Sequence, residues 1–295
     1  MSGRDEDFKK RQEIDGVKMM KTLYVTDLDG TLLNQAAKVS EYSTAVINRL
    51  VEEGMLFTYA TARSLVSASV ATDGLTAKIP VIAYNGAFIF KPDTGEVLHT
   101  VKFTTEEMQR VREVLEKNSI SPLVYSVIDG ADRLSWDLNR ENEGMTNYLS
   151  RRRGDRRLRP LQGDDGLYAG EVFYFTCVGT ADELKPLYNI IKMDTRYVCT
   201  LQKELYQPEY FCEIMPAMAT KAQTITKLKE LWRCDRIVSF GDAINDIPMF
   251  QISDECYAVE NAVPELKAFA TGIIASNEQD GVAKWLLENV VQGQT

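Results

Sequence analysis

The chain has 295 residues, which allows one large domain or two ordinary ones, and its hydrophobic content of 44% is ample for a packed core. Its 43 acidic residues outnumber its 34 basic ones, so we expect no broad basic face for nucleic acid. The longest apolar runs have the length of a strand, whereas a membrane helix needs roughly 20 apolar residues. The composition therefore indicates a soluble protein.

The five cysteines form no CxxC pair and have no histidine partner, which argues against a zinc site and predicts free thiols. The sequence starts without a secretory signal, so we expect a reducing, cytoplasmic location. The only histidine, His99, lies in a strand-like stretch with no nucleophile motif beside it. Catalysis by a Ser-His-Asp or Cys-His arrangement is therefore not expected.

Residues 1–20 are rich in charge and poor in apolar side chains, which predicts a flexible leader outside the fold. Strands are then expected at 23–26, 55–60 and 81–84, and helices between them at 41–53 and 64–71. Strands that alternate with helices are typical of a parallel sheet covered by helices, in which ligands bind at the carboxyl ends of the strands.

The pattern changes after about residue 88. Strands are expected at 97–103, 123–127, 133–136, 171–177, 197–201 and 210–214, and helices at 105–117, 141–152 and 182–192. Strands in pairs separated by single helices indicate an antiparallel α+β module. We therefore expect residues 88–215 to form an inserted cap domain.

After Pro216 the first pattern returns. Helices are expected at 222–232, 247–251, 264–269 and 281–289, and strands at 237–240, 256–259 and 272–274. Residues 21–87 and 216–295 are therefore predicted to fold together as a catalytic core. The predicted fold class is α/β, with a Rossmann-like parallel-sheet core, helices on both of its faces and the inserted α+β cap.

The strongest local signal follows the first predicted strand directly. Asp27 and Asp29 precede Gly30 and Thr31, so two carboxylates leave the carboxyl end of a strand and enter a glycine turn. Two aspartates held this close repel each other unless one is protonated or a cation lies between them. The motif therefore predicts a metal site.

A second run of the same design follows the predicted strand 237–240. Gly241 and Asp242 are followed closely by Asn245 and Asp246, at the end of a strand in the same predicted sheet. Oxygen ligands without a nearby His or Cys favour a hard cation. A few carboxylates completed by water suit Mg²⁺ better than the fuller cage that Ca²⁺ takes.

These runs resemble the motifs of the haloacid dehalogenase superfamily, and the resemblance extends from about residue 21 to the C-terminus. Four motifs occur in the family's order: 27–31 (DLDGT), Thr61 after an apolar strand, Lys221 at a helix start, and 241–246 (GDAIND). Thr61 and Lys221 are weak signals by themselves, because strand-end threonines and helical lysines are usually capping or solvated residues.

The spacing of the motifs classifies the chain further. Only the gap between Thr61 and Lys221 is long enough to hold a domain, and in the family this placement defines the type II cap. The repeated helix-strand-strand units and residues 84–87 (YNGA) resemble the Cof-like subgroup. Ala62 and Ala222 stand where many relatives have glycine, a departure that removes no catalytic group.

The resemblance implies a role for each motif residue. Asp27 would be the nucleophile that forms an aspartyl-phosphate, and Asp29 the general acid and base. Mg²⁺ would be bound by Asp27, the backbone carbonyl of Asp29 and Asp242. The phosphoryl group would be bound by the backbone N–H groups of Leu28 and Ala62 and by the side chains of Thr61, Lys221 and Asn245. Asp246 would lie behind these residues and hold Lys221 or a metal-bound water.

We therefore expect a Mg²⁺-dependent phosphatase that hydrolyses a small phosphomonoester, such as a sugar phosphate or a related metabolite, with no nucleic-acid, membrane or protein partner. The aspartate at position 29 favours turnover, because the family's ion-pumping ATPases carry Thr there and keep a long-lived phosphoenzyme. Two alternatives remain. One is a phosphotransferase or phosphomutase with the same motifs, and the other is a non-catalytic sensor of a phosphorylated ligand.

The predicted cap contains six arginines between residues 151 and 159. Guanidinium groups in such a run suit a second phosphate or a carboxylate on the substrate. The simpler interpretation is a solvated loop or helix end, because charge runs usually face water.

Overall fold

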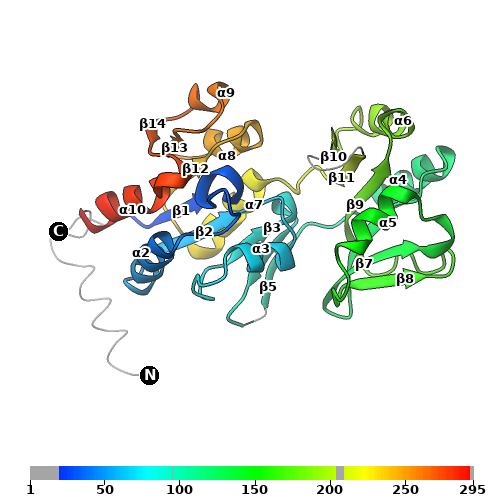
Figure 1. Ribbon diagram of the computed structural model, residues 1–295, viewed down its shortest axis with the longest axis horizontal. Helices are drawn as coiled ribbons and strands as arrows, with labels where there is room; N and C mark the ends of the chain where they lie inside the picture. The colour runs from blue at the N-terminus through cyan, green and yellow to red at the C-terminus, as the bar shows by residue number, and fades with distance from the viewer. Residues whose placement is uncertain (1–19, 95, 204–208, 293–295) are drawn as a thin grey trace. The chain divides into compact units, whose positions relative to one another are not determined.

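The computed structural model describes residues 20–94, 96–203 and 209–292 (Figure 1). The strands are β1 (Thr22–Thr26), β2 (Leu56–Ala60), β3 (Val81–Ala83), β4 (Phe88–Lys91), β5 (Glu96–Thr100), β6 (Leu123–Ile128), β7 (Ala131–Asp137), β8 (Leu158–Leu161), β9 (Glu171–Gly179), β10 (Tyr197–Lys203), β11 (Tyr210–Pro216), β12 (Arg236–Gly241), β13 (Glu255–Val259) and β14 (Gly272–Ile274). The helices are α2 (Glu41–Glu52), α3 (Leu65–Ala71), α4 (Thr105–Lys117), α5 (Glu143–Ser150), α6 (Ala181–Ile191), α7 (Lys221–Trp232), α8 (Ile247–Gln251), α9 (Pro264–Lys267) and α10 (Gly281–Gln292). The leader expected at residues 1–20 lies, except for Met20, outside the described residues.

The chain divides into two compact units. The first contains Met1–Ile82, Lys91–Glu96 and Ile225–Thr295, and the second contains Ala83–Phe90 and Val97–Thr224. The main crossings between the units are therefore at residues 82/83 and 224/225, whereas the sequence pattern placed the domain boundaries at 87/88 and 215/216. The functional division into a catalytic core and a cap stays a prediction.

The first sheet has the strand order β14-β13-β12-β1-β2-β3-β4-β5. Every pair from β14 to β3 is parallel, which confirms the predicted α/β class. The sheet also includes β4 and β5, although their residues fall within the range 88–215 expected for the insertion. We did not predict β4, because its short apolar run follows a glycine-containing turn and lacks a clear period.

The central strand β1 is buried because it has neighbours on both edges. Leu23 and Val25 are fully buried in it, as expected for a strand in the middle of a parallel sheet. The helix α2 is capped at its N-terminus by Ser40, whose hydroxyl accepts a hydrogen bond from the N–H of Ser43 at 2.9 Å. Its apolar residues then recur on one face, and α2 packs against α10.

The second sheet has the order β10-β11-β9-β6-β7-β8. Its pairs are antiparallel except for β7 and β8. Apolar residues of α4 and α6 pack with those of β6, β9 and β11 in one core, so these two helices cover the same face of the sheet. This arrangement is the antiparallel α+β module that the sequence predicted. The parallel strand β8 was not predicted, because it begins inside the arginine run.

Both covering helices begin with the same reciprocal cap. The hydroxyl of Thr104 accepts from the N–H of Glu107, whose carboxylate accepts from the N–H of Thr104. Thr180 and Glu183 repeat the arrangement at the start of α6. Such a box satisfies two backbone donors that a helix end leaves unpaired.

Two further expectations can be compared with the described residues. All five cysteines lie among them and are free thiols, as predicted. Within residues 20–94, 96–203 and 209–292, no helix is both long and apolar enough to cross a membrane.

Candidate active site

Two acidic loops meet because the strands before them are parallel neighbours. Thr26 at the end of β1 lies beside Phe240 near the end of β12. The N–H of Asp27 donates to the carbonyl of Phe240 at 3.0 Å, which joins the two strands at their last residues. The loops that carry Asp27 and Asp242 therefore leave the sheet at the same edge, as the sequence predicted.

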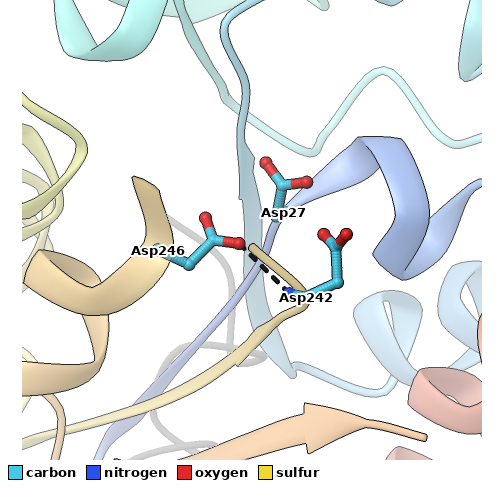
Figure 2. A group of neighbouring side chains, drawn as sticks. All are labelled: Asp27, Asp242 and Asp246. Carbon is cyan, nitrogen blue, oxygen red and sulfur yellow. Dashed lines mark hydrogen bonds between the residues drawn. The ribbon is translucent and has the colours of Figure 1, made fainter. Parts of the chain in front are cut away.

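Three carboxylates come together at this edge. One oxygen each from Asp27, Asp242 and Asp246 lies within 4.8 Å of the other two, and Figure 2 shows the three side chains as neighbours. Asp27 is only 6% exposed, Asp246 is fully buried and Asp242 is partly buried. Three acids held so close in a poorly solvated place are costly without a compensating charge.

Neutral donors orient two of these acids. The hydroxyl of Thr31 donates to Oδ1 of Asp242 at 2.8 Å. Oδ2 of Asp246 accepts from the backbone N–H of Asp242 at 3.2 Å (Figure 2) and from that of Ala243 at 3.2 Å. These bonds fix the direction of each carboxylate.

Two glycines allow the loops to approach the acids. Gly30 has a φ of +79°, and a Cβ added to it would lie 2.3 Å from Oδ2 of Asp242. A Cβ on Gly241 would lie 2.9 Å from Oδ2 of Asp246. Both glycines of the two sequence runs are therefore required by close contacts with the acidic group.

The donor set fits a hard metal ion. All three side chains offer carboxylate oxygens, which are the ligands that divalent cations such as Mg²⁺ and Ca²⁺ prefer. Asp27 and Asp242 were predicted as ligands. Asp246 was predicted to lie behind the site, and the structure places one of its oxygens in the same group. This acidic triad can bind a metal.

Thr61 follows β2 and is fully buried. Its N–H donates to the carbonyl of Ile82 at 2.9 Å, so the adjacent strand fixes its backbone. Its hydroxyl accepts from the N–H of Arg63 at 3.0 Å, which leaves the hydroxyl hydrogen available to another acceptor. This geometry suits the predicted donor to a phosphoryl group. Ala62, between these residues, is exposed.

Asp29 does not join the acidic triad. Its carboxylate instead forms two hydrogen bonds with Arg63, from Nε at 2.8 Å and from Nη2 at 2.6 Å. These bonds raise the pKa of the Arg63 guanidinium above its ordinary value. Arg63 was not predicted as a site residue. Its only signal was its position two residues after Thr61.

The remaining predicted phosphate ligands have different surroundings. Lys221 is the first residue of α7 and is only 5% exposed. Just before it, the hydroxyl of Thr220 accepts from the N–H of Gln223 at 3.2 Å, as an N-terminal cap does. Asn245 is exposed in the turn before α8, and the side chain of Leu28 is fully buried.

The arginine run is not solvated throughout, which corrects the simpler interpretation. Arg157 is 8% exposed, and its guanidinium binds Asp155 through Nη2 at 2.6 Å and Nε at 3.0 Å. Its Nη1 donates to the hydroxyl of Tyr84 at 2.6 Å. The Arg152 guanidinium lies over the ring of Tyr148. A run of charged residues is usually expected to face water, whereas here Arg157 is bound to buried side chains.

The two strand-end loops, two acids of the triad and the parallel sheet are features that the sequence predicted. The family model of haloacid dehalogenase-like hydrolases matches residues 24–286. The chain belongs to this family, which confirms the resemblance found in the motifs.

Individual relatives have phosphatase names. The 5-amino-6-(5-phospho-D-ribitylamino)uracil phosphatase YwtE of Bacillus subtilis is 27% identical over 91% of this chain and 97% of the relative. The pyridoxal phosphate phosphatase YbhA of Escherichia coli is 24% identical over 90% of this chain and 97% of the relative. An X-ray crystal structure of a Thermotoga maritima protein has a TM-score of 0.74 and 27% identity, over 92% of this chain and 97% of that one. The expected enzyme class, a phosphatase of this family, is confirmed.

Proposed function

We propose that this protein is a Mg²⁺-dependent phosphatase that hydrolyses a small phosphomonoester through an aspartyl-phosphate on Asp27. The observation that carries the proposal is the convergence of Asp27 with Asp242 and Asp246 at the ends of β1 and β12. In this proposal residues 21–87 and 216–295 form the catalytic core, and residues 88–215 form a cap that excludes water during turnover.

The reaction has two displacements at phosphorus. A carboxylate oxygen of Asp27 attacks the phosphorus, the bond from phosphorus to the ester oxygen breaks, and Asp29 gives its proton to the leaving alcohol. A water molecule then attacks the phosphorus of the aspartyl-phosphate and transfers a proton back to Asp29. Inorganic phosphate leaves, and the carboxylate of Asp27 is restored.

The other residues stabilise the charge of the phosphoryl group. Thr61 donates its hydroxyl hydrogen, and Lys221 supplies a positive charge in the first turn of α7, where the helix dipole also favours an anion. Asn245 and the backbone N–H groups of Leu28 and Ala62 donate further hydrogen bonds. Mg²⁺ would be held by Asp27, Asp242 and the carbonyl of Asp29, and it would supply the charge that lets the anionic nucleophile approach an anionic substrate. Asp246 orients the loop that carries Asp242, because it accepts hydrogen bonds from the backbone N–H groups of Asp242 and Ala243.

We expect the substrate to be a small phosphorylated metabolite, such as a sugar phosphate. The names of two relatives support this class, since each names a low-molecular-weight phosphate ester as the substrate of that relative. A cytoplasmic location belongs to the same proposal. The five free cysteines support it, because free thiols persist in reducing compartments.

The test is phosphate release from a panel that contains sugar phosphates, pyridoxal phosphate, 5-amino-6-(5-phospho-D-ribitylamino)uracil and p-nitrophenyl phosphate. We expect Mg²⁺-dependent release, and a loss on the order of 10⁴-fold in Asp27→Asn. The matched control is Asp182→Asn, which removes a highly exposed carboxylate on α6. Thermal unfolding checks that both variants are folded.

Each other outcome has a defined meaning. An active Asp27→Asn enzyme would exclude Asp27 as the nucleophile. Phosphate passed to a second sugar hydroxyl instead of water would favour the phosphotransferase or phosphomutase alternative. Binding of panel compounds by folded wild-type protein without turnover would favour the sensor.

A further inference from the structure

The acid that serves as proton donor and acceptor in the proposed reaction has a partner of its own. Nε and Nη2 of Arg63 donate to separate oxygens of Asp29, at 2.8 and 2.6 Å. Both residues belong to the first compact unit. The paired fork is the geometry in which a guanidinium fixes both the position and the plane of a carboxylate.

The backbone on the Arg63 side of this pair is itself anchored. The N–H of Arg63 donates to the hydroxyl of Thr61 at 3.0 Å. The next residue, Ser64, caps α3 by accepting from the N–H of Ser67 at 3.2 Å. Arg63 therefore extends from a short loop fixed at β2 on one side and at α3 on the other.

Asp29 needs such an anchor more than the other acids do. Its side chain is 57% exposed, whereas Asp27 and Asp246 are buried and Asp242 is oriented by Thr31. An exposed aspartate in a loop samples several rotamers, and ordering it costs entropy. The fork of Arg63 selects one rotamer, and the outer lone pair of each oxygen stays open to a proton.

Stability alone does not account for the pair. The Arg63 side chain is 23% exposed, and exposed ion pairs contribute only about 0–1 kcal/mol to stability. The ion pair between Arg49 and Glu53 in α2 shows the ordinary case, with one contact of 3.8 Å between exposed side chains.

We propose that Arg63 is a positioning residue for Asp29. Through its two hydrogen bonds it holds the Asp29 side chain in the orientation from which its protonated carboxyl group gives a proton to the leaving alcohol and its carboxylate later accepts one from water. The proposal rests on the proposed phosphatase reaction. It assigns Arg63 no contact with the substrate.

The dependence of the rate on the leaving group tests this role. Proton donation matters greatly for an alkyl phosphate and little for p-nitrophenyl phosphate, whose leaving group is stable as an anion. We compare kcat/KM, which reports the step that expels the leaving group, for p-nitrophenyl phosphate and the best alkyl phosphate of the panel. In Arg63→Ala we expect a loss of about 10- to 100-fold for the alkyl substrate and less than about threefold for the aryl substrate.

Three further variants separate positioning from other roles. Arg63→Lys keeps the charge but loses the fork, so it should restore only part of the alkyl activity. In an Asp29→Asn background, Arg63→Ala should cause no further loss, because the acid that it orients is gone. Arg49→Ala removes a surface arginine of the same unit and should leave kcat/KM for both substrates unchanged.

The contrary results are equally defined. An equal loss for both substrates would indicate that Arg63 binds the phosphoryl group, and losses that multiply with Asp29→Asn would also overturn the proposal. The pair can be measured apart from activity through the ¹⁵N-detected Nε–H signal of Arg63, which should be protected from exchange and should lose its protection in Asp29→Ala. An unprotected signal in the wild type would overturn the role of Arg63 but leave the proposed phosphatase function untouched. A protected signal in a wild type that releases no phosphate contradicts the proposed function and, with it, the role of the pair.

Discussion

The molecule contains two groups of aspartates, and the hydrogen-bond donors described around them differ. In the first unit, Asp27, Asp242 and Asp246 lie together, and the hydrogen bonds described for the last two come from hydroxyl and backbone N–H donors. In the second unit, Asp155 and Asp132 surround the guanidinium of Arg157, at 2.6 and 3.4 Å. The first group is a set of neighbouring acids whose oxygens could share one metal ion, and the second is built around one arginine.

The pKa shifts in the second group follow from this difference. Burial raises the pKa of Asp132, although the hydroxyl of Tyr84 and the charge of Arg157 oppose the shift. Asp155 is also desolvated, but its bonds to Arg157 outweigh that effect and lower its pKa. Arg157 therefore favours the ionised form of Asp155. In the first group, like charges held close together cost free energy, and a bound cation would offset that cost.

Removal of divalent metal should give the largest effect. We expect EDTA to lower phosphate release by about 1,000-fold or more, because the metal contributes several kcal/mol to the transition state. Excess Mg²⁺ should restore the rate. Activity that survives exhaustive chelation would show that the triad works without a cation.

Asp242→Asn should separate a catalytic role of the acidic triad from a structural one. We expect activity to fall by about 100-fold or more, while the free energy of unfolding in EDTA stays equal or rises by up to about 1 kcal/mol, because one of three like charges is removed. Urea unfolding in EDTA gives this value. A clear loss of stability in the metal-free variant would show that the triad is structural.

Arg157→Met should have the opposite signature. It leaves two partly buried carboxylates without their cation, so we expect a loss of about 3 kcal/mol in the free energy of unfolding. Arg156→Met is the matched control, since Arg156 is its exposed neighbour in the same run, and it should change stability by less than about 0.5 kcal/mol. If the two substitutions changed the free energy of unfolding equally, the buried ion pair would contribute no more to stability than an exposed arginine does.

The smallest predicted effect depends on pH. The pKa of Asp155 lies below its ordinary value of 3.8, so its ionised form stabilises the fold above that pH, and the contribution is lost as the pH falls through the folded-state pKa. We expect Asp155→Asn to cost about 1 kcal/mol at pH 6 and less at pH 3.5. Unfolding curves of both proteins at the two pH values measure the difference. If the difference in free energy of unfolding between the wild type and Asp155→Asn grew toward low pH, the pKa of Asp155 would not be lowered in the folded protein.

Much of the fold followed from periodicity. The strands that became β1, β2, β3, β12 and β13 were predicted within one or two residues, because each is a short apolar run bounded by turn signals. The two strands that were missed, β4 and β8, lack such a pattern. β8 includes Arg159 and Pro160, and it is a strand because β7 offers it a parallel edge.

The site was predictable where side chains follow directly from strand ends. Asp27 and Asp242 had to meet once β1 and β12 were adjacent and parallel, and the two glycine turns indicated that backbone approaches them closely. Arg63 and Arg157 were not predictable as partners. Arginines in loops are usually solvated, and nothing in the local sequence says which acid a long side chain will reach.

Most strands and helices, the acidic loops and their likeness to a phosphatase family could be inferred from the amino-acid sequence, because these depend on residues close together in the chain. The tertiary structure was needed to show that Asp246 lies beside Asp27 and Asp242, that Asp29 pairs with Arg63, and that Arg157 is buried. Several of these partners come from distant parts of the chain, as Arg63 does for Asp29 and Tyr84 for Arg157, and they meet only after folding. Even the local partners, such as Asp155 for Arg157, are selected only when the loop takes its folded conformation.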